Sequence, residues 1–122
     1  MSPVDPHPPI ATRVLETHGS DVVVRIHAPR PDEEPGGDWL CAYRVDGLAA
    51  GPAEGAAHGV DSAQALVLAL VAIGDLLAHQ DQPLRFLGHP DLGFPATDPP
   101  AQGRTTHLTA TLRQPLLPPD VR

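Results

Sequence analysis

The chain has 122 residues, of which 41% are hydrophobic and only 3% aromatic, and its formal net charge is -7 at pH 7. This length suits one domain with a modest core of aliphatic side chains. An acidic chain lacks the clustered basic residues that bind a phosphate backbone or an anionic membrane surface, so we expect neither nucleic acid nor a membrane as a partner.

All eight basic residues are arginines, and alanine, glycine and proline are abundant, which is typical of a high-GC bacterial genome. The single cysteine, Cys41, excludes an internal disulfide and indicates a reducing compartment. Residues Met1 to Pro6 lack the basic region and apolar run of a secretory signal. No apolar stretch approaches the roughly 18 residues of a membrane span. We therefore expect a cytoplasmic protein.

Three segments in the first half of the chain predict strands of one antiparallel sheet. Ile10 to Thr17 is rich in β-branched residues, although its alternation leaves two choices for the inward face. Asp21 to Ala28 alternates valine and isoleucine with arginine and histidine. Trp39 to Leu48 alternates as well, and the side chains that we expect to be buried there are Trp39, Cys41, Tyr43 and Val45. The small residues of Ala49 to Gly59 indicate a linker.

The next segment predicts one long, apolar helix that ends at Gln80 to Pro83. Asp61 is a suitable N-cap, and Gln64 stands three residues later, where a capping box has Glu or Gln. The large side chains that we expect to face the sheet are Leu66, Leu70, Ile73 and Leu77. A flank of small residues, which would allow a second helix to approach closely, comprises Ala65, Ala69 and Ala72. A helix apolar over most of its circumference needs cover, so we expect a homodimer through this flank, unless later segments of the chain cover the helix.

The rest of the chain predicts little regular structure. Leu84 to Leu87 is a possible short strand, and Arg104 to Arg113 alternates like a last strand at a sheet edge. The predicted fold class is α+β: an antiparallel β-meander of three to five strands with one long apolar helix packed on one face. We expect one domain over residues 10–113, a flexible N-terminal tail over residues 1–9 and a Pro-rich tail over residues 114–122.

Three short signatures stand in a fixed order along the chain. They are Trp39-Leu40-Cys41-Ala42-Tyr43 with Gly47, then Gly59-Val60-Asp61-Ser62-Ala63-Gln64-Ala65-Leu66, then Gly88 with Leu92-Gly93-Phe94-Pro95. Together, over about Val22 to Pro95, they resemble a family of short bacterial proteins known only as a domain of unknown function. The resemblance implies a small α+β domain and no catalytic residues.

The outer face of the predicted sheet is the first candidate for a binding site. Arg25, His27 and Arg44 project away from the helix in the predicted register, and Arg13 is a possible fourth member. Planar guanidinium groups bind carboxylates and phosphates in a bidentate manner, so this face could take such a ligand or an acidic partner surface. The alternative is that a strand simply carries polar residues on its solvated side.

Two other groups of residues could carry chemistry. Cys41 lacks a neighbouring base and shares a predicted face with aromatic residues, which favours a core position over a nucleophile. Asp75 and His79 are four residues apart on the helix, and His58 or His89 could join them from a loop to hold zinc or a similar ion. The alternative is a solvated pair on the helix surface.

These observations favour a non-enzymatic protein without a cofactor over an enzyme. The sequence contains no dinucleotide-binding, Walker or nucleophile-elbow motif. We expect a small bacterial binding protein with a protein partner, and one specific version of this hypothesis is an immunity-type protein that neutralises a toxin. The alternative is a small-molecule or metal-dependent activity that uses His79, His89 and Asp75.

Overall fold

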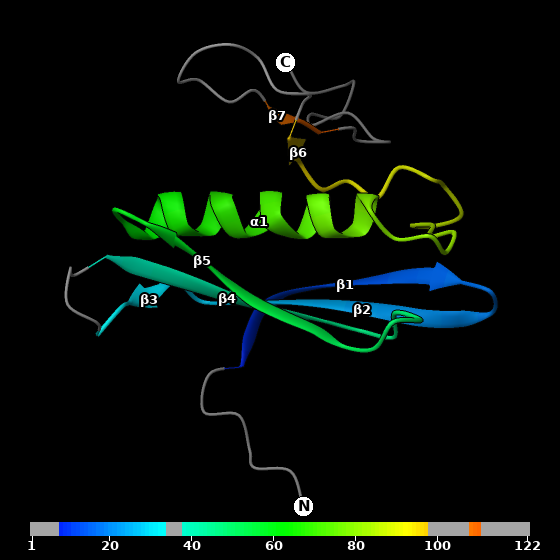
Figure 1. Ribbon diagram of the computed structural model, residues 1–122, viewed down its shortest axis with the longest axis horizontal. Coiled ribbons are helices and arrows are strands. Elements are labelled where there is room, and N and C mark those ends of the chain that lie inside the picture. The colour runs from blue at the N-terminus through cyan, green and yellow to red at the C-terminus, as the bar shows by residue number, and fades with distance from the viewer. Residues whose placement is uncertain (1–7, 34–37, 98–107, 111–122) are drawn as a thin grey trace, which may run out of the picture.

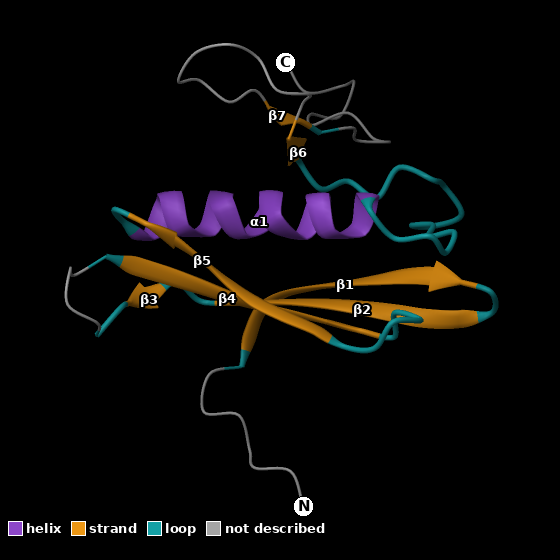
Figure 2. Cartoon of the chain, in the orientation of Figure 1, coloured by secondary structure: helices purple, strands orange, loops and turns teal. Residues whose placement is uncertain are grey.

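The fold was analysed in a computed structural model, which describes residues 8–33, 38–97 and 108–110. One helix lies over one face of a curved antiparallel sheet, and two short strands lie on the far side of the helix (Figure 1, Figure 2). The elements are β1 (Pro9–Thr17), β2 (Ser20–His27), β3 (Arg30–Pro31), β4 (Trp39–Asp46), β5 (Ala53–Gly59), α1 (Ser62–Ala78), β6 (Ala96–Thr97) and β7 (Leu108–Thr109). The predicted α+β class is confirmed.

The main sheet is an antiparallel meander of five strands. β1 pairs with β2, β2 and the short β3 pair with the same side of β4, and β5 pairs with the other side of β4. The hairpin between β1 and β2 turns on two residues, His18 and Gly19, whose φ angles of 44° and 78° are both positive. Two-residue turns of this kind match the right-handed twist of the flanking strands.

Strand β5 corrects the prediction that Ala49 to Gly59 is a linker. Its seven residues pair with β4 in an unbroken register, from Val45 opposite Ala53 to Trp39 opposite Gly59. Over Ala49 to Gly59, alanine and glycine outnumber charged and histidine residues by four to one, so the sequence shows no hydrophobic contrast that could mark a face. β5 is held in the sheet by its backbone and not by apolar side chains, because its N–H and C=O groups form hydrogen bonds with β4.

Alternation along the strands decides which side chains form the core. Leu15 and Thr17 are buried while Val14 is 46% exposed, so β1 turns its odd-numbered residues toward the helix. The fully buried strand residues are Leu15, Val22, Val24, Cys41 and Val45. Trp39 and Tyr43 pack against this cluster and are partly buried. The predicted inward face of β4 is confirmed.

The helix begins where the sequence predicts. The Asp61 side chain accepts a hydrogen bond from the Gln64 backbone N–H at 2.8 Å, and the Gln64 Oε1 accepts one from the Val60 N–H at 2.7 Å. These two bonds satisfy N–H groups that have no partner within the helix. The helix ends at Ala78, with His79 as its C-cap.

The orientation of α1 about its axis differs from the prediction. Ala65, Ala69 and Ile73 have no exposed surface and Leu77 has 4%, whereas Leu66 and Leu70 are only partly buried. Alanines therefore form much of the contact with the sheet, because small side chains let the helix backbone approach the strands. Since Ala65 and Ala69 lie in the core, the Ala65/Ala69/Ala72 flank cannot hold a second helix as predicted.

The chain itself covers the part of α1 near its C-terminal end. Gly74 is buried beneath Pro95, and a Cβ atom built on Gly74 would lie 1.9 Å from the Pro95 carbonyl oxygen. Only glycine permits this crossing. The predicted strand at Leu84 to Leu87 is reduced to two isolated bridges. One joins Arg85 to Glu16, with N···O distances of 2.8 and 2.9 Å, and the other joins Phe86 to His89.

The outer parts of the chain match the predicted organisation only in part. Leu108 and Thr109 pair with Ala96 and Thr97 as a separate two-stranded sheet, and not at the edge of the main sheet. The rest of the predicted strand Arg104 to Arg113 lies outside the described residues, except for Ala110. β1 begins at Pro9, inside the predicted N-terminal tail, and residues 1–7 and 114–122 are not described.

In the part of the chain described, no helix is both long and apolar enough to cross a bilayer.

Candidate functional site

The face of the sheet opposite α1 is the main candidate site, and we call it the open face. It is formed by side chains that alternate with the buried residues of the four long strands. They are Thr12, Val14, Val23, Arg25, His27, Leu40, Ala42, Arg44, Asp46, Glu54, Ala56 and His58. No described element packs across this face (Figure 1).

A charged network occupies the middle of the open face. Arg25, Arg44 and Glu54 stand directly opposite one another on β2, β4 and β5. Arg25 Nη1 lies 3.0 Å from Asp46 Oδ2, and Arg44 Nε lies 2.9 Å from Asp46 Oδ1. Arg44 also donates a hydrogen bond to Glu54. Asp46 therefore offsets the repulsion between two neighbouring guanidinium groups.

This network changes what the arginines can bind. The predicted placement of Arg25 and Arg44 on one outer face is confirmed, but carboxylates of the same chain already neutralise both. The side chains of Arg25, Asp46 and Arg44 are 34 to 41% exposed. Pairs that exposed contribute about 0–1 kcal/mol to stability, so the network orients polar groups at the surface more than it stabilises the fold. The result is a locally neutral patch.

Apolar side chains lie beside the network. Val14 is 46% exposed and stands opposite Val23, which in turn stands opposite Asp46. As predicted, His27 alternates onto the same face as Arg25, and its side chain is half-buried. The open face thus combines exposed aliphatic groups with oriented arginines.

Arg13 does not belong to the open face, which corrects its predicted grouping. It has the same parity as Leu15 and therefore lies on the helix side of the sheet. Its guanidinium carbon is 4.3 Å from the centroid of the Phe86 ring and 5.1 Å from that of Phe94. Arg13 Nη1 donates a hydrogen bond to the Leu92 carbonyl at 2.8 Å. This side chain fastens the segment after the helix to β1.

Cys41 occupies the core position that the sequence predicts. Its thiol is fully buried and donates to the His27 carbonyl oxygen at 3.3 Å. Burial raises the pKa of the Cys41 thiol, because desolvation disfavours the thiolate. A protonated thiol without access to solvent is a poor nucleophile.

The residues of the alternative metal site are held by other contacts. The Asp75 carboxylate accepts hydrogen bonds from the Thr97 backbone N–H at 2.8 Å and from its hydroxyl at 2.7 Å. His79 Nδ1 lies 2.6 Å from the Asp75 carbonyl oxygen, and His89 closes a turn with Phe86. Within residues 8–33, 38–97 and 108–110, no three His, Cys, Asp or Glu side chains gather closely enough to hold a metal ion. The structure therefore does not assemble Asp75, His79 and His89 into the predicted site.

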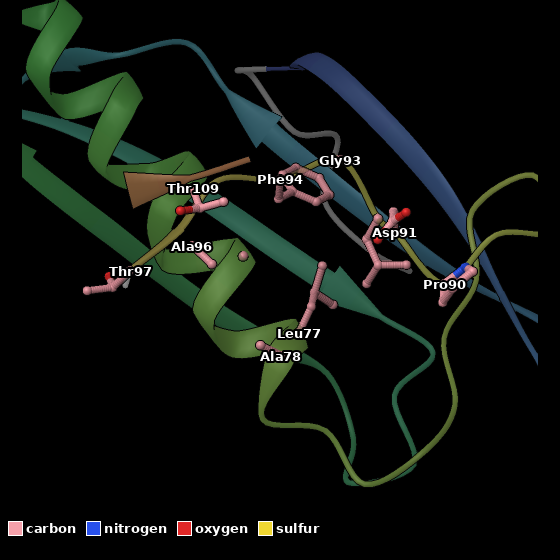
Figure 3. A pocket seen from close by; sticks show the side chains of 11 residues that line it. Leu77, Ala78, Pro90, Asp91, Gly93, Phe94, Ala96, Thr97 and Thr109 are labelled. Carbon is pink, nitrogen blue, oxygen red and sulfur yellow. The ribbon is translucent and has the colours of Figure 1, made fainter. Parts of the chain in front are cut away.

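A small pocket lies between the end of α1 and the segment that crosses it (Figure 3). Its volume is about 320 Å³, and its walls include Leu77 and Ala78 on the helix and Asp91 and Phe94 on the crossing segment. Pockets that bind small molecules usually have volumes of about 300–1,000 Å³ and several convergent polar groups. This one is at the small end of that range, and among the described residues that line it only Asp91 is charged. None of His79, His89 and Asp75 lines it.

The sequence did not single out two members of the open-face network, Asp46 and Glu54. The alternation of Trp39 to Leu48 sets Asp46 on the outer face, but nothing near it in the sequence distinguishes it from an ordinary polar residue. Glu54 was missed because its strand was interpreted as a linker. The useful signal would have been a strand assignment for β5, since the register then sets Glu54 opposite Arg44.

A family model described as "Domain of unknown function (DUF6968)" matches residues 11–96. No curated protein and no solved structure matches the chain. The matched region contains β1 from residue 11 onward, β2 to β5, all of α1 and the segment that crosses it, so it includes the open face. The chain therefore belongs to the family of this domain of unknown function.

Proposed function

We propose that the protein is a small, non-enzymatic binding protein that engages a protein partner through its open face. The observation that carries the proposal is the position of the exposed Val14 and the partly buried Val23 beside oriented arginines, on a face that no described element covers. Arginine is enriched at the centres of protein interfaces, where its planar group both stacks and donates hydrogen bonds. Contacts with Val14 and Val23 would add apolar burial beside it.

Charge favours a basic partner surface. The chain carries 15 acidic and 8 basic residues, so its long-range field attracts positive charge. The open face itself is close to neutral, because Arg25 and Arg44 are balanced by Asp46 and Glu54. A basic partner would thus be steered by the whole molecule and held by short-range contacts at the open face. The association rate should fall as salt concentration rises.

The remaining parts of the proposal concern the setting of the protein. A free, buried Cys41 supports a reducing compartment, and we place the protein in a bacterial cytoplasm. The immunity-type role, in which the partner is a toxin, stays a prediction at the level of protein class.

A matched pair of variants tests the proposal. Val14 on the open face is 46% exposed and Val67 on the helix is 47% exposed, so Val14→Glu and Val67→Glu introduce the same charge at equally accessible sites on opposite sides of the molecule. Tagged wild type and both variants are used to isolate partners from the native host. The candidate partner is then purified and its affinity measured by calorimetry.

The proposal predicts that Val14→Glu weakens binding by about tenfold or more, which corresponds to roughly 1.4 kcal/mol. Val67→Glu should bind like wild type. A partner that is lost with Val67→Glu but retained with Val14→Glu would show that the helix side is the interface. Binding equal for all three proteins would also refute a role for the open face.

A further inference from the structure

The two edges of the main sheet differ in how they are protected. An edge strand presents unpaired N–H and C=O groups that can pair with another chain. At the β1 edge, Pro9 removes a donor, a register shift between Pro9 and Ala11 breaks the strand, and Glu16 is paired with Arg85. These are the devices by which proteins block edge-to-edge association.

The β5 edge has none of these devices. Among the described residues β5 pairs only with β4, and its register runs over seven residues without a bulge. Its sequence, AEGAAHG, contains neither proline nor lysine. The edge is therefore a regular template for one more antiparallel strand.

We propose that this strand is β5 of a second copy of the chain, in a dimer whose twofold axis passes between the Ala56 residues of the two copies. In this symmetric antiparallel register, Ala56 faces itself and Glu54 faces His58 of the second copy. The twofold axis makes this pair occur twice. A carboxylate and an imidazole are complementary partners in directly opposed positions.

The side chains of this register are placed to meet. Glu54, Ala56 and His58 alternate onto the open face, and the side chains of Glu54 and His58 are 65% and 55% exposed. Arg44 contacts Glu54, and Asp32 Oδ2 lies 3.3 Å from His58 Nε2. Across the dimer, Glu54 would therefore lie between Arg44 of its own copy and the His58 imidazole of the second copy, which also contacts Asp32.

Residues beyond the strand ends also fit this register. Val60, which follows β5, is 74% exposed, the largest exposure among the large apolar side chains described. One residue beyond the strand, it comes opposite Pro52 of the second copy. The two five-stranded sheets would become one sheet of ten strands, with the two open faces on the same side. This assembly differs from the predicted dimer, which used a helix flank that is buried.

Charge reversal tests the register. Sedimentation equilibrium is measured for wild type, Glu54→Lys, the double variant Glu54→Lys/His58→Glu, and the control Asp81→Lys, which makes the same kind of change at an exposed position outside β5. Glu54→Lys replaces the carboxylate with an ammonium group opposite His58 in both symmetric pairs. Each pair then either loses its hydrogen bond or brings two like charges together. We expect its dimer dissociation constant to rise about tenfold. The double variant, which restores opposite charges, should return to within about threefold of wild type.

A disulfide test locates the axis independently. Ala56→Cys should form a cross-linked dimer under mild oxidation because the two thiols face each other, whereas Ala50→Cys, in the turn before β5, should not. Cys41 is fully buried and does not compete. A wild type that stays monomeric at high concentration would overturn the proposal. So would a dimer that Glu54→Lys leaves unchanged, or cross-linking that is equal at positions 50 and 56.

Discussion

Replacing Gly74 with alanine tests whether the segment after the helix crosses α1 as the structure shows. In an uncovered helix this change stabilises, because alanine exceeds glycine in helix propensity by up to about 1 kcal/mol. Here the new Cβ atom would lie 1.9 Å from the Pro95 carbonyl oxygen and 2.9 Å from the Pro95 carbonyl carbon. Both are backbone atoms, so rotation of a side chain cannot relieve the clash.

The magnitude follows from these two opposed effects. Overpacking of a tight contact costs about 1–3 kcal/mol, and contact with backbone places Gly74→Ala at the upper end of that range. After subtraction of the propensity gain, we expect the free energy of unfolding to fall by about 2 kcal/mol. In a domain of this size the melting temperature should drop by about 8 °C.

Urea unfolding followed by circular dichroism measures the change. Ala63→Gly, at an exposed position of the same helix, measures the propensity effect alone and should destabilise by less than about 1 kcal/mol. If Gly74→Ala instead stabilises the protein by the amount that Ala63→Gly destabilises it, Pro95 does not lie on the helix and the reasoning is refuted.

Two further substitutions test contacts on the helix side of the sheet. Asp61→Ala removes the acceptor of the Gln64 N–H and should lower the free energy of unfolding by about 1 kcal/mol. Asp61→Asn should retain most of the stability. Equal losses for the two variants in urea unfolding would show that the cap does not contribute. Arg13→Met keeps an apolar chain between Phe86 and Phe94 but loses the cation–π contacts and the bond to the Leu92 carbonyl. We expect a loss of about 1–2 kcal/mol together with faster hydrogen exchange in residues 86–95, and unchanged exchange there would contradict the fastening role.

The sequence was sufficient for features with a clear local signal. The alternation of β2 and β4 identified the buried faces of both strands, and Asp61 with Gln64 marked the start of α1. The resemblance to a family of unknown function was confirmed by the match over residues 11–96. These features depend on residues close together in the sequence, whose pattern predicts the local structure without knowledge of distant contacts.

Other features depend on contacts between distant parts of the chain. The helix is apolar at nearly every position, so its periodicity could not show that Ala65 and Ala69, and not Leu66 and Leu70, face the sheet most directly. Arg13 was grouped with the other arginines because nothing near it in sequence reveals that Phe86 and Phe94 cover it. β5 was missed because alanine and glycine carry no hydrophobic contrast, and the loss of Glu54 from the candidate site followed from that.

The helix covers one face of the sheet and leaves the other open, and thiol labelling distinguishes the two faces. In native wild type, Cys41 is fully buried with a raised pKa, so it should react with a thiol reagent only upon unfolding. Val14→Cys places a second thiol at a position that is 46% exposed, and this variant should gain one rapidly reacting group. Rapid reaction of Cys41 in the native protein, or protection of the cysteine at position 14, would contradict this assignment of the two faces.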